Sequence, residues 1–217
     1  MGKEKQKAAL TKINPSPEEQ IRQQMEEQGL REQFTEVVDK LVEEIQKINI
    51  RLSKKCNRQI MDNIIWRIKS PDSIVRKLQR KGLDVSLECA KKSLNDLVGI
   101  RIICSFQDDV YRMAKAIKKM TDFKIVKEKN YIANPKASGY RSIHLIGSVQ
   151  NGEGDITVEI QIRSVAMNYW AILDHQLCYK NEKKEVEFIR KELKDYAVAI
   201  AKIDKKFFKL RKMIEKL

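Results

Sequence analysis

Residues 127–144, which read KEKNYIANPKASGYRSIH, bring together side chains that are suited to holding a nucleotide. A turn-forming NPKASG segment contains Lys136. The side chains on either side of it include Lys129, Tyr140, Arg141 and His144. Cationic side chains bind phosphate, an aromatic ring can stack on a base, and a glycine lets the backbone approach a ligand closely. This stretch therefore predicts a nucleotide-binding loop, whose chemistry depends on the residues around it.

Two strand-like runs follow the loop, at 142–150 and 155–163, and the Asn-Gly-Glu-Gly segment between them is a hairpin signal. Successive side chains on a strand point to opposite faces, so one face of the second run is apolar and the other carries Glu159 and Gln161. In the hairpin, His144 can lie on the same polar face as Glu159. One such strand alone would indicate an ordinary solvent-exposed sheet face, but several together favour a cleft.

Another apolar run, at 97–106, adds a second carboxylate and a further cation. Its Arg101 points away from the isoleucines on either side, and Asp96 comes just before the run. Together with Glu159, Asp96 could supply the acidic ligands of a Mg²⁺ ion, because Mg²⁺ is usually held by one or two carboxylates and by nucleotide phosphates. Asp96 taken alone could equally cap a turn.

A third polar cluster lies at 67–77, where a Ser-Pro pair marks the start of a helix. Its members are Arg67, Lys69, Ser73, Arg76 and Lys77. Helix N-termini bind anions readily, so these side chains could hold phosphates, although a solvated basic helix face would show the same pattern. The sequence contains neither GxxxxGK[ST] nor GxGxxG, so a phosphate site here would depend on side chains.

These clusters must be positioned by helices and strands that alternate along the chain. Apolar spacing and capping signals predict helices at 16–29, 34–52, 70–82, 108–120, 164–179 and 182–217. Runs rich in β-branched residues predict strands at 97–106, 123–129, 142–150 and 155–163. The pattern predicts an α/β or α+β fold with a central mixed sheet of about five strands flanked by helices. We expect a flexible tail at 1–15 and a single domain at 16–217, with a helical C-terminal arm at 182–217.

The composition agrees with a globular protein that binds an anionic partner. The chain has 217 residues, 42% hydrophobic content and a net charge of +14, from 44 Lys and Arg against 30 Asp and Glu. This charge favours a nucleotide, RNA or DNA as partner, although dispersed lysines that serve solubility would give the same balance. No apolar run approaches the roughly 20 residues of a membrane helix. The four cysteines show no CxxC spacing, which indicates free thiols in a reducing cytoplasm.

Four segments of the chain resemble the synthetase domain of RelA/SpoT-type alarmone synthetases. They read RIKSPDSIVRKL at 67–78, NDLVGIRIICSF at 95–106, YIANPKASGYRSIHL at 131–145 and VEIQIRSVAMNYWAILDHQLCYK at 158–180. They stand in the family's order within a core of about residues 35–180, and they match its small, single-domain branch. The resemblance implies a nucleotidyltransferase-like synthetase fold with helical extensions and no hydrolase activity.

Members of this family use Mg²⁺ to transfer pyrophosphate from ATP to the 3′-hydroxyl of GDP or GTP, which makes the stringent-response alarmones ppGpp and pppGpp. The resemblance implies that Asp96 and Glu159 bind Mg²⁺ and are catalytic, and that Glu159 helps to deprotonate the attacking hydroxyl. It assigns to ATP the adenine-sandwiching pair Arg67 and Arg101 and the phosphate contacts Lys69, Ser73 and Lys77. It assigns to GDP or GTP, with Tyr140 stacked on guanine, the residues Lys129, Lys136, Tyr140, Arg141, His144, Gln161 and Asn168.

The residues leave two other functions open. One is a toxic relative that pyrophosphorylates the 3′ end of tRNA, which the charge of +14 favours and the intact acceptor loop disfavours. The other is a non-catalytic RNA-binding regulator, which the presence of both Asp96 and Glu159 disfavours. The resemblance further implies a homotetramer; the apolar stripes at 34–52 and 186–214 are compatible with one, and equally with core packing. It also raises (p)ppGpp as an allosteric ligand and single-stranded RNA as a partner.

Overall fold

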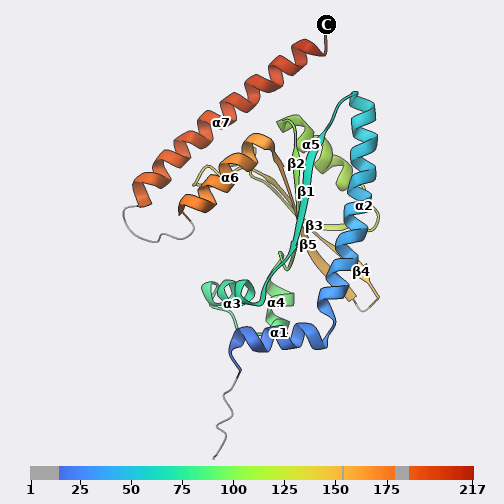
Figure 1. Ribbon diagram of the computed structural model, residues 1–217, viewed down its shortest axis with the longest axis vertical. Helices are drawn as coiled ribbons and strands as arrows, with labels where there is room; N and C mark the ends of the chain where they lie inside the picture. The colour runs from blue at the N-terminus through green and yellow to red at the C-terminus, as the bar shows by residue number, and fades with distance from the viewer. Residues whose placement is uncertain (1–14, 153, 179–185) are drawn as a thin grey trace, which may run out of the picture.

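The computed structural model describes residues 15–152, 154–178 and 186–217 (Figure 1). The predicted tail, apart from Pro15, and residues 182–185 of the predicted arm lie outside these ranges. A five-stranded sheet occupies the centre of the molecule, with helices on both sides of it, which confirms the predicted fold class.

The sheet is mixed, with the strand order β1-β2-β5-β4-β3. Strands β2 and β5 run parallel, and every other neighbouring pair is antiparallel. The strands are β1 (Met61–Ile68), β2 (Val98–Cys104), β3 (Lys124–Asn130), β4 (Ile143–Asn151) and β5 (Gly154–Ser164). The predicted hairpin is confirmed, since β4 and β5 pair from Asn151 opposite Gly154 to Ile143 opposite Ile162.

Strand β1 is not predicted from the apolar runs of the sequence. It lies at the edge of the sheet, and Met61 is its only buried residue. A register shift between Met61 and Asn63 also disturbs the alternation of side chains. The strand therefore lacks the period of two that identifies a half-buried strand, and four of the five strands were predictable by position.

Seven helices surround the sheet in the described part of the chain. They are α1 (Pro17–Glu27), α2 (Leu30–Cys56), α3 (Pro71–Arg80), α4 (Leu87–Ser93), α5 (Gln107–Ile117), α6 (Val165–Cys178) and α7 (Val186–Ile214). Ser16 caps α1 and Ser70 caps α3, each accepting a hydrogen bond from the backbone amide three residues on, as the Ser-Pro pairs predict. The sequence does not predict α4, because seven residues are too few to show a helical period.

The apolar core lies between one face of the sheet and helices α2 and α5. Its fully buried side chains from the central strands and from these helices include Ile100, Ile102, Ile160, Leu41 and Met113. Figure 1 shows α2 and α5 on one side of the sheet and α6 and α7 on the other. Because side chains alternate along a strand, the polar residues of β2 and β5 point to the face opposite this core.

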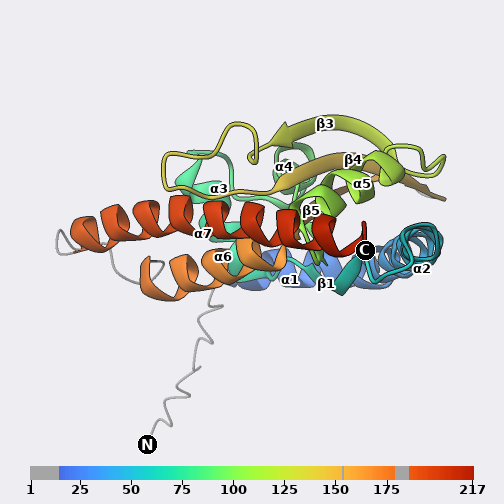
Figure 2. The same cartoon turned by 90° about the horizontal axis from the view of Figure 1, so that it is seen from above.

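The long helix α7 lies beside α6 in both views (Figures 1 and 2). Trp170 on α6 donates a hydrogen bond from Nε1 to the carbonyl oxygen of Leu193 at 2.7 Å. Further along, the Ser164 hydroxyl donates to Asp204 Oδ2 at 2.6 Å, and an ion pair of 2.8 Å joins Arg211 to the start of α5. These contacts attach α7 to the rest of the fold along most of its length.

Two predictions about composition can also be compared with the structure. Cys56, Cys89, Cys104 and Cys178 are all free thiols, as their spacing indicates. Among the described residues, none of the helices combines the length and the apolar character that crossing a membrane requires.

Candidate active site

Glu159 lies at the centre of a chain of hydrogen bonds on the polar face of the sheet. Its Oε1 is 3.0 Å from His144 Nδ1, and its Oε2 accepts a hydrogen bond from Gln161 Nε2 at 2.8 Å. The other ring nitrogen of His144 is 2.8 Å from the Tyr140 hydroxyl, to which Arg163 donates at 2.8 Å. His144 and Gln161 stand directly opposite each other on β4 and β5, so the prediction that His144 and Glu159 share one face is confirmed.

The contacts of Glu159 identify its donors. An ionised Glu159 can only accept hydrogen bonds, so His144 donates to it from Nδ1. Burial raises the pKa of the Glu159 carboxyl, but the hydrogen bonds from His144 and Gln161 outweigh burial, and the pKa falls below its usual value. Glu159 is therefore a half-buried carboxylate that stays ionised at neutral pH.

Asp96 lies between two lysines, just before β2. Lys69 Nζ donates to Asp96 Oδ2 at 2.8 Å, and Lys77 Nζ on α3 is 2.6 Å from Oδ1. Burial raises the pKa of Asp96, yet the two lysines outweigh burial and lower it below its usual value. The negative charge of Asp96 also acts on Glu159, whose pKa it raises, so the two carboxylates belong to one region of the site.

A cavity of about 130 Å³ joins this region to the pair of arginines expected around adenine. Its polar lining consists of Arg67, Asp96, Arg101, Glu159 and Gln161. The pairing of β1 with β2 places Arg67 opposite Gly99, two positions from Arg101, so both arginines lie on the same sheet face. The structure thus brings together the two carboxylates and both arginines that the sequence singled out on separate elements.

Arg101 is a half-buried cation without a full set of partners. Its Nε has no hydrogen-bond partner among the described residues. Burial and the nearby charge of Arg163 lower the pKa of Arg101. A half-buried cation with an unpaired Nε favours an anionic or aromatic ligand, either of which would compensate the charge.

The loop between β3 and β4 surrounds Tyr140 with cations and a second tyrosine. Lys136 Nζ lies 4.8 Å from the centroid of the Tyr140 ring and 4.9 Å from that of Tyr131, and Arg163 Cζ lies 5.0 Å from that of Tyr140. The two tyrosine rings meet edge to face, with centroids 5.9 Å apart. Lys129 on β3 pairs directly opposite His144, so its side chain lies on the same sheet face. Two rings and several cations therefore lie close to Glu159.

Three of the expected ligands lie at the margin of this cluster. Arg141 donates to a backbone carbonyl of its own loop at 3.3 Å and lines a narrow space beneath α6 and α7. Ser73 lies in the first turn of α3, where it is hydrogen bonded to the serine that caps the helix. Asn168 on α6 accepts a hydrogen bond from Arg163 at 3.3 Å and reaches the cluster through that arginine. Their assigned contacts with nucleotides stay predictions.

Arg163 and Tyr131 are part of the cluster but were not among the expected ligands. Arg163 is 5% exposed and donates to Tyr140, Gln161 and Asn168. Strand alternation does place it on the polar face, but its partners come from three separate segments. The signal for Tyr131 was its place in the same loop as Tyr140, at the opposite end of the turn.

The donor set of the site fits a Mg²⁺ ion that is held largely by its nucleotide. Asp96 and Glu159 offer hard carboxylate oxygens, and nucleotide phosphates usually complete such a site. The described residues contain no group of three or more His, Cys, Asp or Glu side chains that could hold a metal without such help.

Comparisons with known proteins agree with the family that the sequence motifs resemble. The family described as the region found in RelA / SpoT proteins matches residues 66–184. GTP pyrophosphokinase YwaC of Bacillus subtilis (strain 168) is 39% identical over 153 residues, which are 69% of this chain and 73% of that protein. The crystal structure of small alarmone synthetase 1 from Bacillus subtilis bound to its product pppGpp aligns with a TM-score of 0.77 and 29% identity, over 87% of this chain and 99% of that one. The crystal structure of that synthetase with AMPCPP aligns with a TM-score of 0.69 and 26% identity, over 88% and 100%.

Proposed function

Because the chain belongs to the RelA/SpoT family, we propose that it is a GTP diphosphokinase, which transfers the pyrophosphate group of ATP to the 3′-hydroxyl of GDP or GTP. The products are ppGpp or pppGpp, together with AMP. The observation that carries the proposal is the position of Glu159. Its ionised carboxylate lies between a basic cavity suited to ATP and a tyrosine-lysine loop suited to a guanine nucleotide. We place the activity in the cytoplasm, where both nucleotides are available.

In this proposal Glu159 accepts the proton of the 3′-hydroxyl. The hydroxyl oxygen attacks the β-phosphorus of ATP, and the bond from that phosphorus to the oxygen that bridges to the α-phosphate breaks. A ribose hydroxyl is a poor nucleophile at neutral pH, so a carboxylate within hydrogen-bond reach accelerates the attack. His144 and Gln161 support this role, because their hydrogen bonds orient the carboxylate and keep it ionised.

The cations of the cavity have a complementary role towards ATP. Negative charge gathers on the phosphoryl oxygens as the transferred group moves, so positioned cations lower the barrier. Lys69 and Lys77 are proposed to bind these oxygens, and Arg67 and Arg101 to enclose the adenine ring. Mg²⁺, bound by both carboxylates and the phosphates, would neutralise further charge on the transferred group.

The acceptor nucleotide is proposed to bind against the loop between β3 and β4. Tyr140 would stack on guanine, and its hydroxyl would hold His144 in the orientation that supports Glu159. Lys136 is exposed and now lies over the tyrosine rings, so it can move to the phosphates of the acceptor. Lys129 adds a cation on the same face.

The direct test is to incubate the purified protein with ATP, GDP and Mg²⁺ and to separate the nucleotides by anion-exchange chromatography. We expect ppGpp and AMP in equal amounts. Glu159→Gln should lower kcat by about 10²–10⁴-fold, because it removes the proton acceptor and keeps the shape of the side chain. Asp155→Asn is the matched control, since Asp155 is an exposed carboxylate on the same strand. A folded wild-type protein without product would overturn the proposal, and turnover retained in Glu159→Gln would remove Glu159 from this role.

Two substitutions of Tyr140 separate the functions of its ring and its hydroxyl. Tyr140→Ala should raise the KM for GDP far more than the KM for ATP, because it removes the surface on which guanine stacks. Tyr140→Phe keeps the ring and loses the bonds to His144 and Arg163, so it should lower kcat with a smaller effect on the KM for GDP. Equal loss of affinity for both nucleotides in Tyr140→Ala would contradict the assignment.

We also propose that the protein forms a homotetramer through α7. Large apolar side chains on this helix are exposed, among them Phe188 at 70%, Phe207 at 56% and Ile214 at 70%. Contiguous exposed apolar surface on a globular protein marks an interaction site. Light scattering on a size-exclusion column should give the mass of four chains, and Phe207→Lys combined with Ile214→Lys should reduce it. A monomeric wild-type protein would overturn this assembly.

A further inference from the structure

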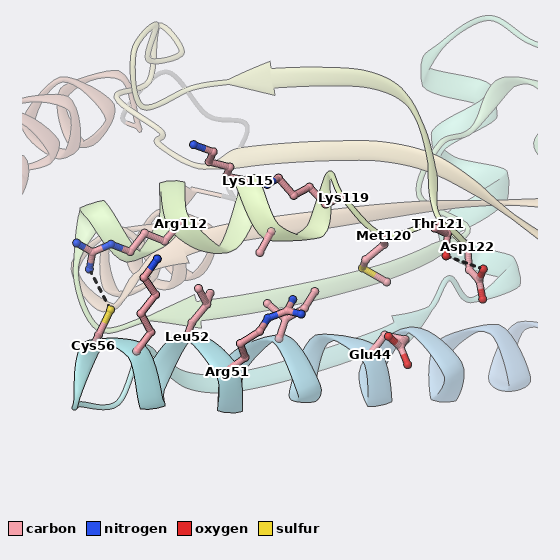
Figure 3. Close-up of a pocket in the computed structure, with 13 residues that line it drawn as sticks. Glu44, Arg51, Leu52, Cys56, Arg112, Lys115, Lys119, Met120, Thr121 and Asp122 are labelled. Atoms are coloured by element: carbon pink, nitrogen blue, oxygen red, sulfur yellow. Dashed lines mark hydrogen bonds between the residues drawn. The ribbon is translucent and has the colours of Figure 1, made fainter.

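Helices α2 and α5 lie on the side of the sheet opposite the candidate active site (Figure 1), and a wide groove runs between them (Figure 3). Its volume of about 880 Å³ falls within the range of roughly 300–1,000 Å³ that small-molecule sites occupy. Its floor is apolar and consists mainly of Ile48, Leu52, Ala116 and Met120. Its walls carry the five cations Arg51, Lys55, Arg112, Lys115 and Lys119.

The positive charge of the groove is not balanced within the described chain. Arg112 forms ion pairs with the aspartates at the start of α5, but the other four cations have no ion pair or side-chain hydrogen bond among the described residues. The carboxylates of Glu44 and Asp122 also line the groove, yet both are paired with lysines outside it. Glu44 is 2.8 Å from Lys47, and Asp122 is 2.7 Å from Lys40. An anion that enters the groove therefore meets uncompensated cations from two helices.

The spacing of these cations gives the groove two matching walls. Arg51 and Lys55 are four residues apart on α2, and Lys115 and Lys119 are four residues apart on α5. Residues at this spacing lie on one helix face, where like charges repel each other. Figure 3 shows Arg51 extending from α2 towards α5. A ligand with several anionic groups would relieve the repulsion within both pairs at once.

We propose that this groove is a second anion site, which binds a small molecule carrying several phosphate groups. The two cationic walls bind the phosphates, and the apolar floor accommodates the carbon skeleton of the ligand. Single-stranded nucleic acid is a poorer fit, because bases bind by stacking on aromatic side chains and none of the lining residues is aromatic. The groove is separate from the proposed active site, since it lies on the other face of the sheet and shares no lining residue with the cavity there.

Cys56 gives a local readout for this site. It lies at the end of α2 in the lining of the groove, with Arg112 Nη1 3.8 Å from its Sγ. Inorganic tripolyphosphate serves as the probe, and alkylation of the full chain by iodoacetamide is measured by peptide mass spectrometry. Cys89 and Cys178 are internal controls, because they are half-buried thiols outside the groove. Tripolyphosphate at ten times its dissociation constant should slow alkylation of Cys56 by about tenfold, by mass action, and leave the controls unchanged.

Charge reversal tests whether the walls bind the probe. Lys115→Glu with Lys119→Glu should raise the dissociation constant for tripolyphosphate more than about tenfold, because two attractions become repulsions. Lys54→Glu with Lys206→Glu makes the same change in net charge at exposed positions outside the groove, and it should retain the protection of Cys56.

Three results would overturn the proposal. The first is equal protection of Cys56 in the charge-reversed variant and in the wild-type protein, and the second is equal slowing at all three cysteines. The third is protection by a single-stranded RNA oligonucleotide but not by tripolyphosphate, which would assign the groove to nucleic acid. Circular dichroism of each variant confirms that it is folded, so that a lost effect reflects the groove.

Discussion

Gly139 lets the acceptor loop lie directly against α7, and a single methyl group there should disturb both stability and acceptor binding. Its φ is +94°, which L-residues rarely adopt, and an added Cβ would lie 2.5 Å from the Cβ of Ala197. Carbon atoms pack at about 3.5–4.0 Å, so the loop or the helix must move by about 1 Å. The backbone conformation costs about 1–2 kcal/mol and the overpacking about 1–3 kcal/mol.

Gly139→Ala should therefore lower the free energy of unfolding by about 2–5 kcal/mol. For a chain of this size each kcal/mol corresponds to a fall in Tm of about 2–4 °C, which thermal denaturation can resolve. Tyr140 is the next residue, so displacement of the loop should also raise the KM for GDP. The KM for ATP should change less, because the arginines and lysines proposed to bind ATP lie on β1, β2 and α3 and in the short connection between β1 and α3.

A double-mutant cycle separates the cost of the backbone conformation at Gly139 from the cost of overpacking against Ala197. Ala197→Gly removes the methyl group that Gly139→Ala would meet, although it costs about 1 kcal/mol of helix propensity by itself. The cycle subtracts this loss of helix propensity. We expect a favourable coupling energy of about 1–3 kcal/mol between the two substitutions, because the overpacking is relieved. The cost of the backbone conformation at position 139 should remain. A coupling near zero, or a Gly139→Ala variant with unchanged Tm and unchanged KM for GDP, would refute the close contact between loop and helix.

Three further predictions follow from buried charges. His144→Gln removes a group that lowers the pKa of Glu159 against the effect of burial, so the acid limb of the kcat/KM profile should move to higher pH, and an unmoved limb would contradict this. Burial raises the pKa of Asp204, so folding loses stability as the pH rises from the ordinary Asp value through the raised one. Asp204→Asn should remove this loss and raise the free energy of unfolding at pH 7 relative to pH 4, as urea denaturation would measure; an unchanged difference between the two pH values would argue against it. Arg58→Met removes a bidentate partner at 2.7 Å from the fully buried Asp109, which keeps its ion pair with Arg112, so the free energy of unfolding should fall by about 1.5–3 kcal/mol; a loss no larger than that of Lys54→Met would show the pair to be unimportant.

The central part of the site was predictable because the strands that carry it alternate cleanly. Ile160 and Ile162 point into the core, so Glu159 and Gln161 must point away from it, and the hairpin turn sets which residues of β4 lie opposite. The same reasoning placed Arg101 on β2. Periodicity and turn chemistry are local signals, and they were sufficient here because one face of the sheet is fully buried.

The rest of the site depends on contacts between segments that are far apart in sequence. Arg141 belongs to the acceptor loop, yet its side chain lies under α6 and α7, because the loop folds over residues nearly sixty positions further along. Arg163 acquires its role only because β5 ends beside Tyr140 and α6. Strand β1, which presents Arg67, has one buried residue and so lacks a periodic pattern.

Helix α7 meets the acceptor loop at Ala197 on one face and exposes apolar residues such as Tyr196 and Phe207 on another. If four chains associate through the exposed face, the same rigid helix transmits the effect of assembly to the loop. The affinity for the guanine nucleotide would then depend on the concentration of the protein itself. The rate of synthesis per chain would then change as copies accumulate, so the amount of enzyme in the cell would regulate the activity of each copy.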